Sequence, residues 1–135
     1  MAASTHSNRV ALLMDIFPTA LDIAGLARPE GIDGVSFLPT LRGEAQQDPA
    51  RDLYFVWREG GLLHQGDTTE ALRQGDWKLV RDNVAAPIEL YNVKDDPKET
   101  TDLANKEKST FRNLSAVLRR QIQRGGSVPW QAPAK

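Results

Sequence analysis

The chain has 135 residues, of which 17 are basic and 18 acidic, so its formal net charge is −1 at pH 7. This length is enough for one domain with a hydrophobic core. The balanced charge gives no electrostatic case for binding nucleic acid or an anionic membrane surface. Because the chain has no cysteine, disulfides and thiolate metal sites are excluded. No apolar run approaches the roughly 18 residues that a membrane-spanning helix needs.

The N-terminal part of the chain is predicted to hold one helix, over residues 16–24. Its apolar side chains recur at helical spacing: Phe17, Ala20, Leu21 and Ala24. Asp15 is placed to cap this helix, Pro18 sits where its missing N–H costs little, and Gly25 is a natural stop. Residues 1–9 are expected to be poorly anchored, and they lack the basic region and apolar core of a signal peptide.

A segment rich in glycine and proline follows, over residues 27–43. It is expected to be an ordered loop with one helical turn near residues 38–41. Residues 46–50 are polar and are predicted to form a linker to the second half of the chain.

Four strand-length stretches, separated by turn residues, are predicted at residues 52–58, 68–74, 76–81 and 87–93. A turn at Gln74, Gly75 and Asp76 joins the middle two stretches into a hairpin. Ile88 and Leu90 alternate with Glu89 and Tyr91. This alternation fits an antiparallel sheet with one face on a core and the other face in water.

The last element is a predicted helix that Ser109 can cap and that Gly125 and Gly126 end. One apolar face is formed by Phe111, Leu114, Val117, Leu118 and Ile122. The fold class is therefore expected to be α+β. A small four-stranded antiparallel sheet carries the C-terminal helix on one face, beside an N-terminal helix and a Gly/Pro-rich loop. Trp77 and Leu79 are expected in the core between sheet and helix.

A family resemblance rests on several motifs that occur in one order from Met14 to Ala104. The clearest run is Arg-x-Gly-Asp-Trp-Lys-Leu at residues 73–79, followed by Glu-Leu-Tyr-Asn-x-x-x-Asp-Pro-x-Glu-x-x-Asp-Leu-Ala at residues 89–104. These residues resemble the C-terminal region of the sulfatase family, in particular arylsulfatases and enzymes similar to N-acetylgalactosamine-6-sulfatase. Upstream, residues 15–19, 24–26 and 31–39 resemble the segments that precede that region.

The resemblance implies a division of the chain into four parts. Residues 1–13 would be an N-terminal extension, and residues 14–50 would correspond to the end of the sulfatase N-terminal domain. Residues 51–126 would be the C-terminal subdomain, and residues 127–135 a tail.

The resemblance also implies which chemistry this chain lacks. Sulfatases use a formylglycine made from Cys or Ser in a Cys/Ser-x-Pro-x-Arg motif. The nearest sequence, Ser-Val-Pro-Trp-Gln at residues 127–131, has Gln131 in place of the arginine. The calcium-binding acidic residues of the family belong to its N-terminal region and have no match here. No catalytic or metal-binding residue and no cofactor is therefore expected in this chain, and calcium and formylglycine are implied only for a full-length sulfatase.

An acidic cluster after the last predicted strand could suggest a calcium site: Asp95, Asp96, Glu99 and Asp102. A turn is the preferred explanation. Asp side chains bond to nearby backbone in turns, and Pro97 presets a turn dihedral. The spacing of an EF-hand, with its central glycine and final glutamate, is absent.

Arg58 and His64 are the predicted substrate-binding residues. The loop over residues 59–67 carries His64, and loops on a rigid sheet often carry binding groups. The resemblance implies that loops of this subdomain can line the substrate entrance, where both side chains would meet an anionic substrate. The alternative for His64 is an ordinary surface position. Lys78, which lies with Arg73 in the hairpin, could also bind sulfate. The preferred explanation for Lys78 is a place on a solvated strand face, where its stem covers apolar surface.

The leading functional hypothesis is the C-terminal part of a sulfuric-ester hydrolase, which completes the fold, shapes the substrate entrance and is inactive alone. The substrate of the full-length enzyme would be a sulfated carbohydrate or an aryl sulfate; residues 58–61 resemble those of family members that act on sugars. Such a parent would be exported if it is like many sulfatases. The alternative is a stand-alone noncatalytic binding or oligomerisation module.

The N-terminal apolar run is a further candidate for binding. Residues 10–14, with Ile16 and Phe17, are densely apolar and resemble a segment that the family packs into its larger N-terminal domain. Burial of apolar area contributes roughly 25 cal/mol per Å², so such a run favours contact with a partner. Self-association through this run, or its exposure, is expected in preference to a well-packed monomer.

Overall fold

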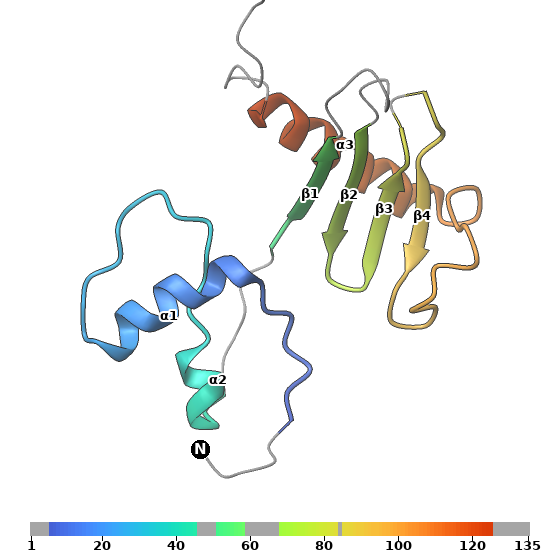
Figure 1. Ribbon diagram of the computed structural model, residues 1–135. Helices are drawn as coiled ribbons and strands as arrows, with labels where there is room; N and C mark the ends of the chain where they lie inside the picture. Colours follow the sequence, from blue (N-terminus) through green and yellow to red (C-terminus); the bar gives the residue numbers. More distant parts are fainter. Residues whose placement is uncertain (1–5, 46–50, 59–67, 84, 126–135) are drawn as a thin grey trace, which may run out of the picture. The chain divides into compact units, whose positions relative to one another are not determined.

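The computed structural model describes residues 6–45, 51–58, 68–83 and 85–125, which fall in two compact units, Met1–Pro49 and Ala50–Lys135 (Figure 1). The first unit contains a 3-10 turn and two helices: η1 Leu13–Asp15, α1 Ile16–Ile23 and α2 Leu38–Arg42. The second unit contains four strands and a long helix: β1 Leu53–Arg58, β2 Thr68–Gln74, β3 Trp77–Arg81, β4 Glu89–Asn92 and α3 Lys108–Gly125. None of the helices in the described ranges has the length and apolar character needed to cross a bilayer.

The four strands form one antiparallel sheet in the order β1-β2-β3-β4. In its register, Leu72 lies opposite Leu79, and Leu79 lies opposite Leu90. Gly75 makes the turn between β2 and β3 with φ of 59°, a left-handed conformation that glycine adopts without steric cost. The predicted strands and hairpin are confirmed, with ends that differ by no more than two residues.

A leucine core joins one face of this sheet to α3, which lies behind the strands in Figure 1. Three fully buried leucines of the sheet meet three buried residues of the helix: Leu72, Leu79 and Leu90 with Leu114, Val117 and Leu118. Trp77 is partly buried and packs against this cluster. The expected α+β fold is therefore confirmed, including the placement of Trp77 and Leu79 between sheet and helix.

The helix α3 begins one residue earlier than its predicted cap. Lys108 is its first residue, so Ser109 lies inside the helix and the prediction that Ser109 caps it is wrong. The backbone N–H of Phe111 already donates to the carbonyl of Glu107 at 2.9 Å, which starts the helical bonding before Ser109. The helix ends at Gly125, as predicted.

The sheet face opposite α3 is less exposed to solvent than predicted from the alternation of apolar and polar residues over 88–91. Tyr91 is only 8% exposed, and its hydroxyl donates to Glu89 Oε2 at 2.8 Å. Lys78 lies opposite Tyr91 on β3, and its Nζ bonds Glu99 Oε1 at 2.6 Å. This ion pair holds the turn after β4 against that face. The expectation that Tyr91 faces water is therefore wrong: Tyr91 is buried on a face where Lys78, directly opposite it, pairs with a residue 21 positions away in the sequence.

In the first unit, Asp15 has a different role from the predicted helix cap. Its side chain makes no cap bond to α1; its two carboxylate oxygens accept from the backbone N–H groups of Leu12 at 2.8 Å and Val35 at 2.9 Å. Thr19 Oγ1 donates to the Asp15 carbonyl at 2.6 Å and accepts from the Phe37 N–H at 3.1 Å. Asp15 and Thr19 thus tie residues 35–37 to one side of α1.

The backbone at Gly34 also approaches the backbone at Met14 closely, which holds this segment against the start of α1. A Cβ at Gly34 would lie 2.2 Å from the carbonyl oxygen of Met14, a distance that no side chain tolerates. The chain then enters α2, which confirms the predicted helical turn. The helix ends at Arg42 and is capped by Gly43, whose φ is 77°.

Leu79 provides a direct test of the leucine core. Leu79→Ala is expected to lower the free energy of unfolding by about 2–5 kcal/mol, because a fully buried leucine loses its contacts and leaves a cavity. Val56→Ala removes apolar atoms from a β1 side chain that is 44% exposed and should change stability by no more than about 0.5 kcal/mol. Urea melts of both variants measure the difference, and equal losses would contradict the observed register.

Candidate functional site

Of the two predicted substrate residues, Arg58 lies at the end of the sheet where β1 leads toward β2. Arg58 is the last residue of β1 and lies opposite Thr68, the first residue of β2. His64 lies outside the described residues, within the connection between these two strands. A role for Arg58 and His64 in binding substrate stays a prediction.

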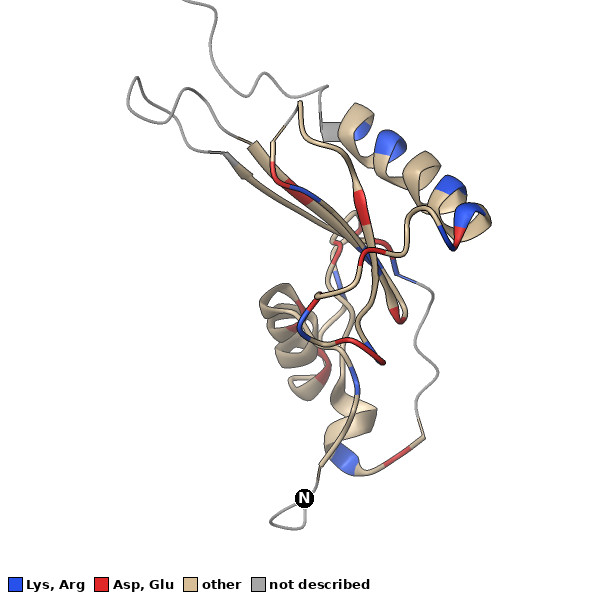
Figure 2. Cartoon of the chain, turned by 90° about the vertical axis from the view of Figure 1, so that its right-hand side faces the viewer, with Lys and Arg blue, Asp and Glu red and all other residues tan. Residues whose placement is uncertain are grey.

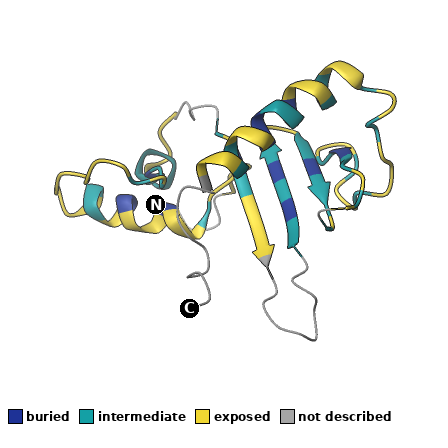
Figure 3. Ribbon diagram, turned by 90° about the horizontal axis from the view of Figure 1, so that it is seen from above, coloured by how far each residue is buried: buried dark blue, intermediate teal, exposed yellow. Residues whose placement is uncertain are grey.

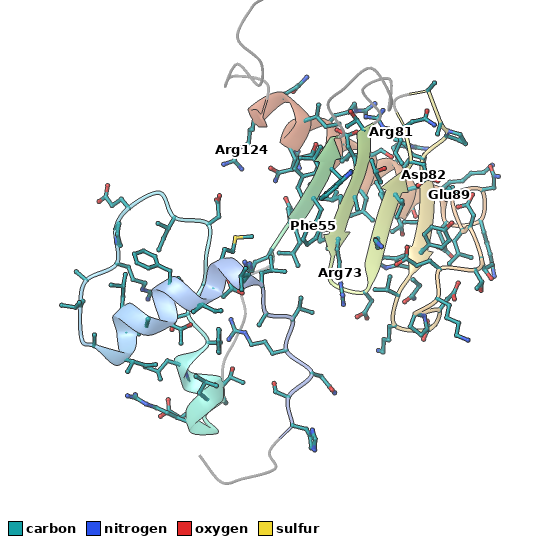
Figure 4. All side chains as sticks on the ribbon, viewed as in Figure 1. Phe55, Arg73, Arg81, Asp82, Glu89 and Arg124 are labelled. Carbon is teal, nitrogen blue, oxygen red and sulfur yellow. The ribbon has the colours of Figure 1, made fainter. Side chains whose placement is uncertain are left out.

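A buried polar network lies two residues along β2 from this strand end. Glu70 is 3% exposed, and its carboxylate accepts from the Tyr54 hydroxyl at 2.8 Å and from Arg81 Nε at 3.0 Å. Arg81 Nη2 donates to the same carboxylate oxygen as Nε, so the arginine binds it in a forked manner. Figure 4 labels Arg81 at this end of the sheet, with Asp82 and Glu89 close to it in the view. The network fixes β1, β2 and β3 to one another beside the β1–β2 connection.

Sequence reasoning did not single out Glu70, although the sequence contains a signal for it. Glu70 and Leu72 are two residues apart on one strand, so they lie on the same face. The hairpin register places Arg81 directly opposite Glu70. Two opposite charges that face each other across the hairpin, on the same side of the sheet as the core leucines, indicate an ion pair. Because α3 covers that side, the pair is expected to be buried.

Lys78, the other candidate sulfate ligand, and Arg73, which lies in the same hairpin, both have partners in the described structure. Lys78 pairs with Glu99, and the two side chains are 27% and 29% exposed. Arg73 Nε donates to the carbonyl of Gly75 at 3.0 Å, across the hairpin turn. The pairing of Lys78 with a carboxylate disfavours it as a sulfate ligand.

The acidic cluster after β4 forms a turn, as preferred from the sequence. Asp96 accepts from the backbone N–H groups of Thr100 at 2.7 Å and Thr101 at 2.9 Å, and Asp102 accepts from that of Leu90 at 3.0 Å. Desolvation raises the pKa of Asp96, but the bonds from Thr101 and Thr100 outweigh it, and the pKa lies below its ordinary value. Within the described ranges, no group of three or more His, Asp or Glu side chains could hold a metal ion.

Substitution of Arg81 tests whether the buried network stabilises the sheet. Arg81→Met is expected to lower the free energy of unfolding by about 3–5 kcal/mol, because it leaves the Glu70 carboxylate buried without a countercharge. Tyr54→Phe, the matched control, removes one bond to the same carboxylate but keeps the ion pair, and should cost about 1.5–3 kcal/mol. Denaturant unfolding measures both. A loss for Arg81→Met no larger than that for Tyr54→Phe would show that the ion pair does not hold this end of the sheet.

Tyr91 provides a pH-dependent test. Burial, the hydrogen bond to Glu89 and the charges of Glu89, Asp102 and Glu99 together raise the pKa of Tyr91 to about 12, with burial the largest cause. The folded state therefore favours the neutral phenol. Its contribution to stability is complete below pH 10 and is lost as the pH rises from about 10 to about 12.

Phenolate absorbance measures this pKa directly. The chain has two tyrosines, so a Tyr54→Phe background leaves Tyr91 as the only phenol whose absorbance changes with pH. We expect its absorbance to rise near pH 12, and Tyr91→Phe to remove the corresponding part of the alkaline loss of stability. A phenolate that forms at about pH 10 in the folded protein would contradict the burial of Tyr91.

Comparison with known proteins places these elements in a family. The family model described as "N-sulphoglucosamine sulphohydrolase, C-terminal" matches residues 1–126. Arylsulfatase K of Gallus gallus is 33% identical over 115 residues, which are 82% of this chain and 22% of that protein. The N-acetylglucosamine-6-O-sulfatase of Bacteroides thetaiotaomicron is 30% identical over 107 residues, or 77% of this chain and 19% of that protein.

A solved structure shares the fold as well as the sequence. It is described as a 2-O GAG sulfatase and aligns with a TM-score of 0.69 and 30% identity, over 82% of this chain and 24% of that one. The chain thus spans about a fifth of the length of the relatives it matches. The match to the family model over residues 1–126, together with the sheet and helix that the solved relative shares, shows that the chain belongs to the sulfatase family and corresponds to its C-terminal region.

Proposed function

We propose that this chain serves as the C-terminal part of a sulfuric-ester hydrolase, where it completes the fold and shapes the substrate entrance. The observation that carries the proposal is the match of residues 1–126 to the C-terminal family model. The leucine core supports a structural role, because it gives the four strands and α3 a rigid frame on which loops can be held.

The residues of this chain do not fit the formylglycine and calcium that the family implies. The sequence has no cysteine and no Ser-x-Pro-x-Arg motif that could supply the formylglycine. In the part of the chain that the structure describes, the acidic side chains near β4 bind backbone N–H groups and Lys78 and form no cation site. We therefore assign no chemical step to this chain, and we propose that it is inactive alone.

Contact with substrate is proposed for Arg58 and His64. Arg58 carries a permanent positive charge, and His64 can carry one, so both suit an anionic sulfate ester. Arg58 is the last residue of β1, two positions beyond Val56, which lies opposite Glu70, and His64 follows Arg58 in the sequence. A sulfated carbohydrate is the proposed substrate class, since two relatives are named for N-acetylglucosamine-6-O-sulfate and GAG sulfate esters. An aryl sulfate is the alternative, in keeping with the arylsulfatase relative.

The proposal predicts no sulfatase turnover by the purified chain. An aryl sulfate and a 6-O-sulfated N-acetylglucosamine should both remain intact, because covalent catalysis requires an activated nucleophile that binding groups cannot replace. A full-length sulfatase assayed under the same conditions is the positive control. Hydrolysis that follows the protein through purification, and that disappears when one of its residues is substituted, would contradict the proposal.

A further inference from the structure

The helix α3 carries charge of one sign only. Its 18 residues include no acidic side chain and five basic ones: Lys108, Arg112, Arg119, Arg120 and Arg124. The helix therefore contributes +5 to a chain whose net charge is −1, so the rest of the chain carries −6. Figure 2 shows basic positions recurring along α3 in blue. The balance of charge in the whole chain does not extend to this helix.

Three of these side chains line one side of α3, and we call them the basic stripe. Lys108, Arg112 and Arg119 are separated by four and seven residues, which are about one and two helical turns. All three are exposed, whereas the apolar side of the helix buries Leu114 and Leu118 against the sheet (Figure 3). At the helical rise per residue, the basic stripe is about 16 Å long.

The stability of the helix does not explain the basic stripe. The helix dipole favours a cation in the last turn, where Arg124 lies, but disfavours one in the first turn, where Lys108 lies. Lys108 and Arg112 form a like-charge pair four residues apart, and such pairs destabilise a helix. Acidic residues at the same spacing would relieve the repulsion, and α3 contains none.

The charge of the basic stripe, rather than its exposure, identifies it as a binding surface. Exposure alone is weak evidence, because the chain spans about a fifth of its relatives. Within the described residues, however, no carboxylate pairs with Lys108, Arg112 or Arg119. Burial of unpaired charges against another domain is strongly unfavourable. The basic stripe is therefore suited to contact with water or with an anionic partner.

The length of the basic stripe favours a polyanion with oxyanion groups along its chain. Arginine binds such groups through two N–H donors, which suits sulfate esters. A membrane surface fits less well, because the apolar side of α3 is packed on the sheet and cannot enter a bilayer. Single-stranded nucleic acid stacks its bases on aromatic rings, and the one aromatic residue of α3, Phe111, packs against the core.

We propose that the basic stripe of α3 binds a sulfated polysaccharide chain. The proposal rests on the proposed function, because its partner is the polymeric form of the same substrate class. The basic stripe lies on a different element from Arg58, which ends β1. Binding there keeps a polymeric substrate attached to the protein and requires no chemical step from this chain.

Titration of the purified chain with a fluorescent heparin octasaccharide at low salt tests the proposal. The comparison ligands are a hyaluronan octasaccharide, which has carboxylates but no sulfate, and a single-stranded oligonucleotide. The heparin octasaccharide is expected to bind more tightly than either, with an affinity that falls as salt is added. Arg112→Gln combined with Arg119→Gln should weaken its binding by about 10-fold or more, because two charge-assisted hydrogen bonds are lost.

Lys94→Gln combined with Lys98→Gln is the matched control. It removes the same charge from two exposed positions after β4 and should leave the binding unchanged. Both double variants should keep the helical circular dichroism, because glutamine is a good helix former and the substituted side chains are exposed.

Four outcomes would overturn the proposal. They are no binding of heparin at low salt, equal binding of either comparison ligand, no effect of the α3 variant, and an equal loss in the control. Loss of binding with Arg58→Gln in place of the α3 variant would also overturn it, but would support the proposed entrance. Turnover by the chain alone would contradict the proposed function and leave binding by α3 to be measured separately.

Discussion

The burial of three leucines between the sheet and α3 is the interaction on which the second unit depends. Leu72, Leu79 and Leu90 lie side by side on β2, β3 and β4 and are fully buried by the helix. A small sheet needs such a cover, because its strands gain little stability in water without a packed face. The same cover removes Glu70 from water, and the carboxylate is satisfied by Tyr54 and Arg81. The apolar core and the polar network are thus two results of one packing arrangement.

The first unit is held together by a different kind of interaction. Asp15 and Thr19 bind backbone groups of residues 35–37, and the absence of a side chain at Gly34 lets that segment approach Met14. These bonds use the polar side of α1 and leave its apolar side without a cover in the first unit. A unit built in this way can pack its apolar side against a larger domain, whereas the second unit already contains its own core.

Local patterns in the sequence were sufficient to predict the helices and strands, but not to predict the polar contacts between them. The strands and the hairpin follow from short apolar runs and from a glycine that tolerates the turn, and α3 follows from its apolar spacing. Asp15 binds Val35, 20 residues away, and Lys78, opposite Tyr91, binds Glu99, 21 residues away, so no local rule could predict these contacts. Glu70 could be predicted only once the hairpin register was known. The proposed substrate residues Arg58 and His64 follow from position and charge alone, and their role stays a prediction.

Amide hydrogen exchange most directly tests the claim that the second unit is self-contained while the apolar side of α1 has no cover in the first unit. The amides of β2 and β3 should be strongly protected, because the leucine core closes over them within one chain. The amides of α1 should be weakly protected, because its apolar side chains are exposed. Protection of α1 that equals that of β2 would contradict the account.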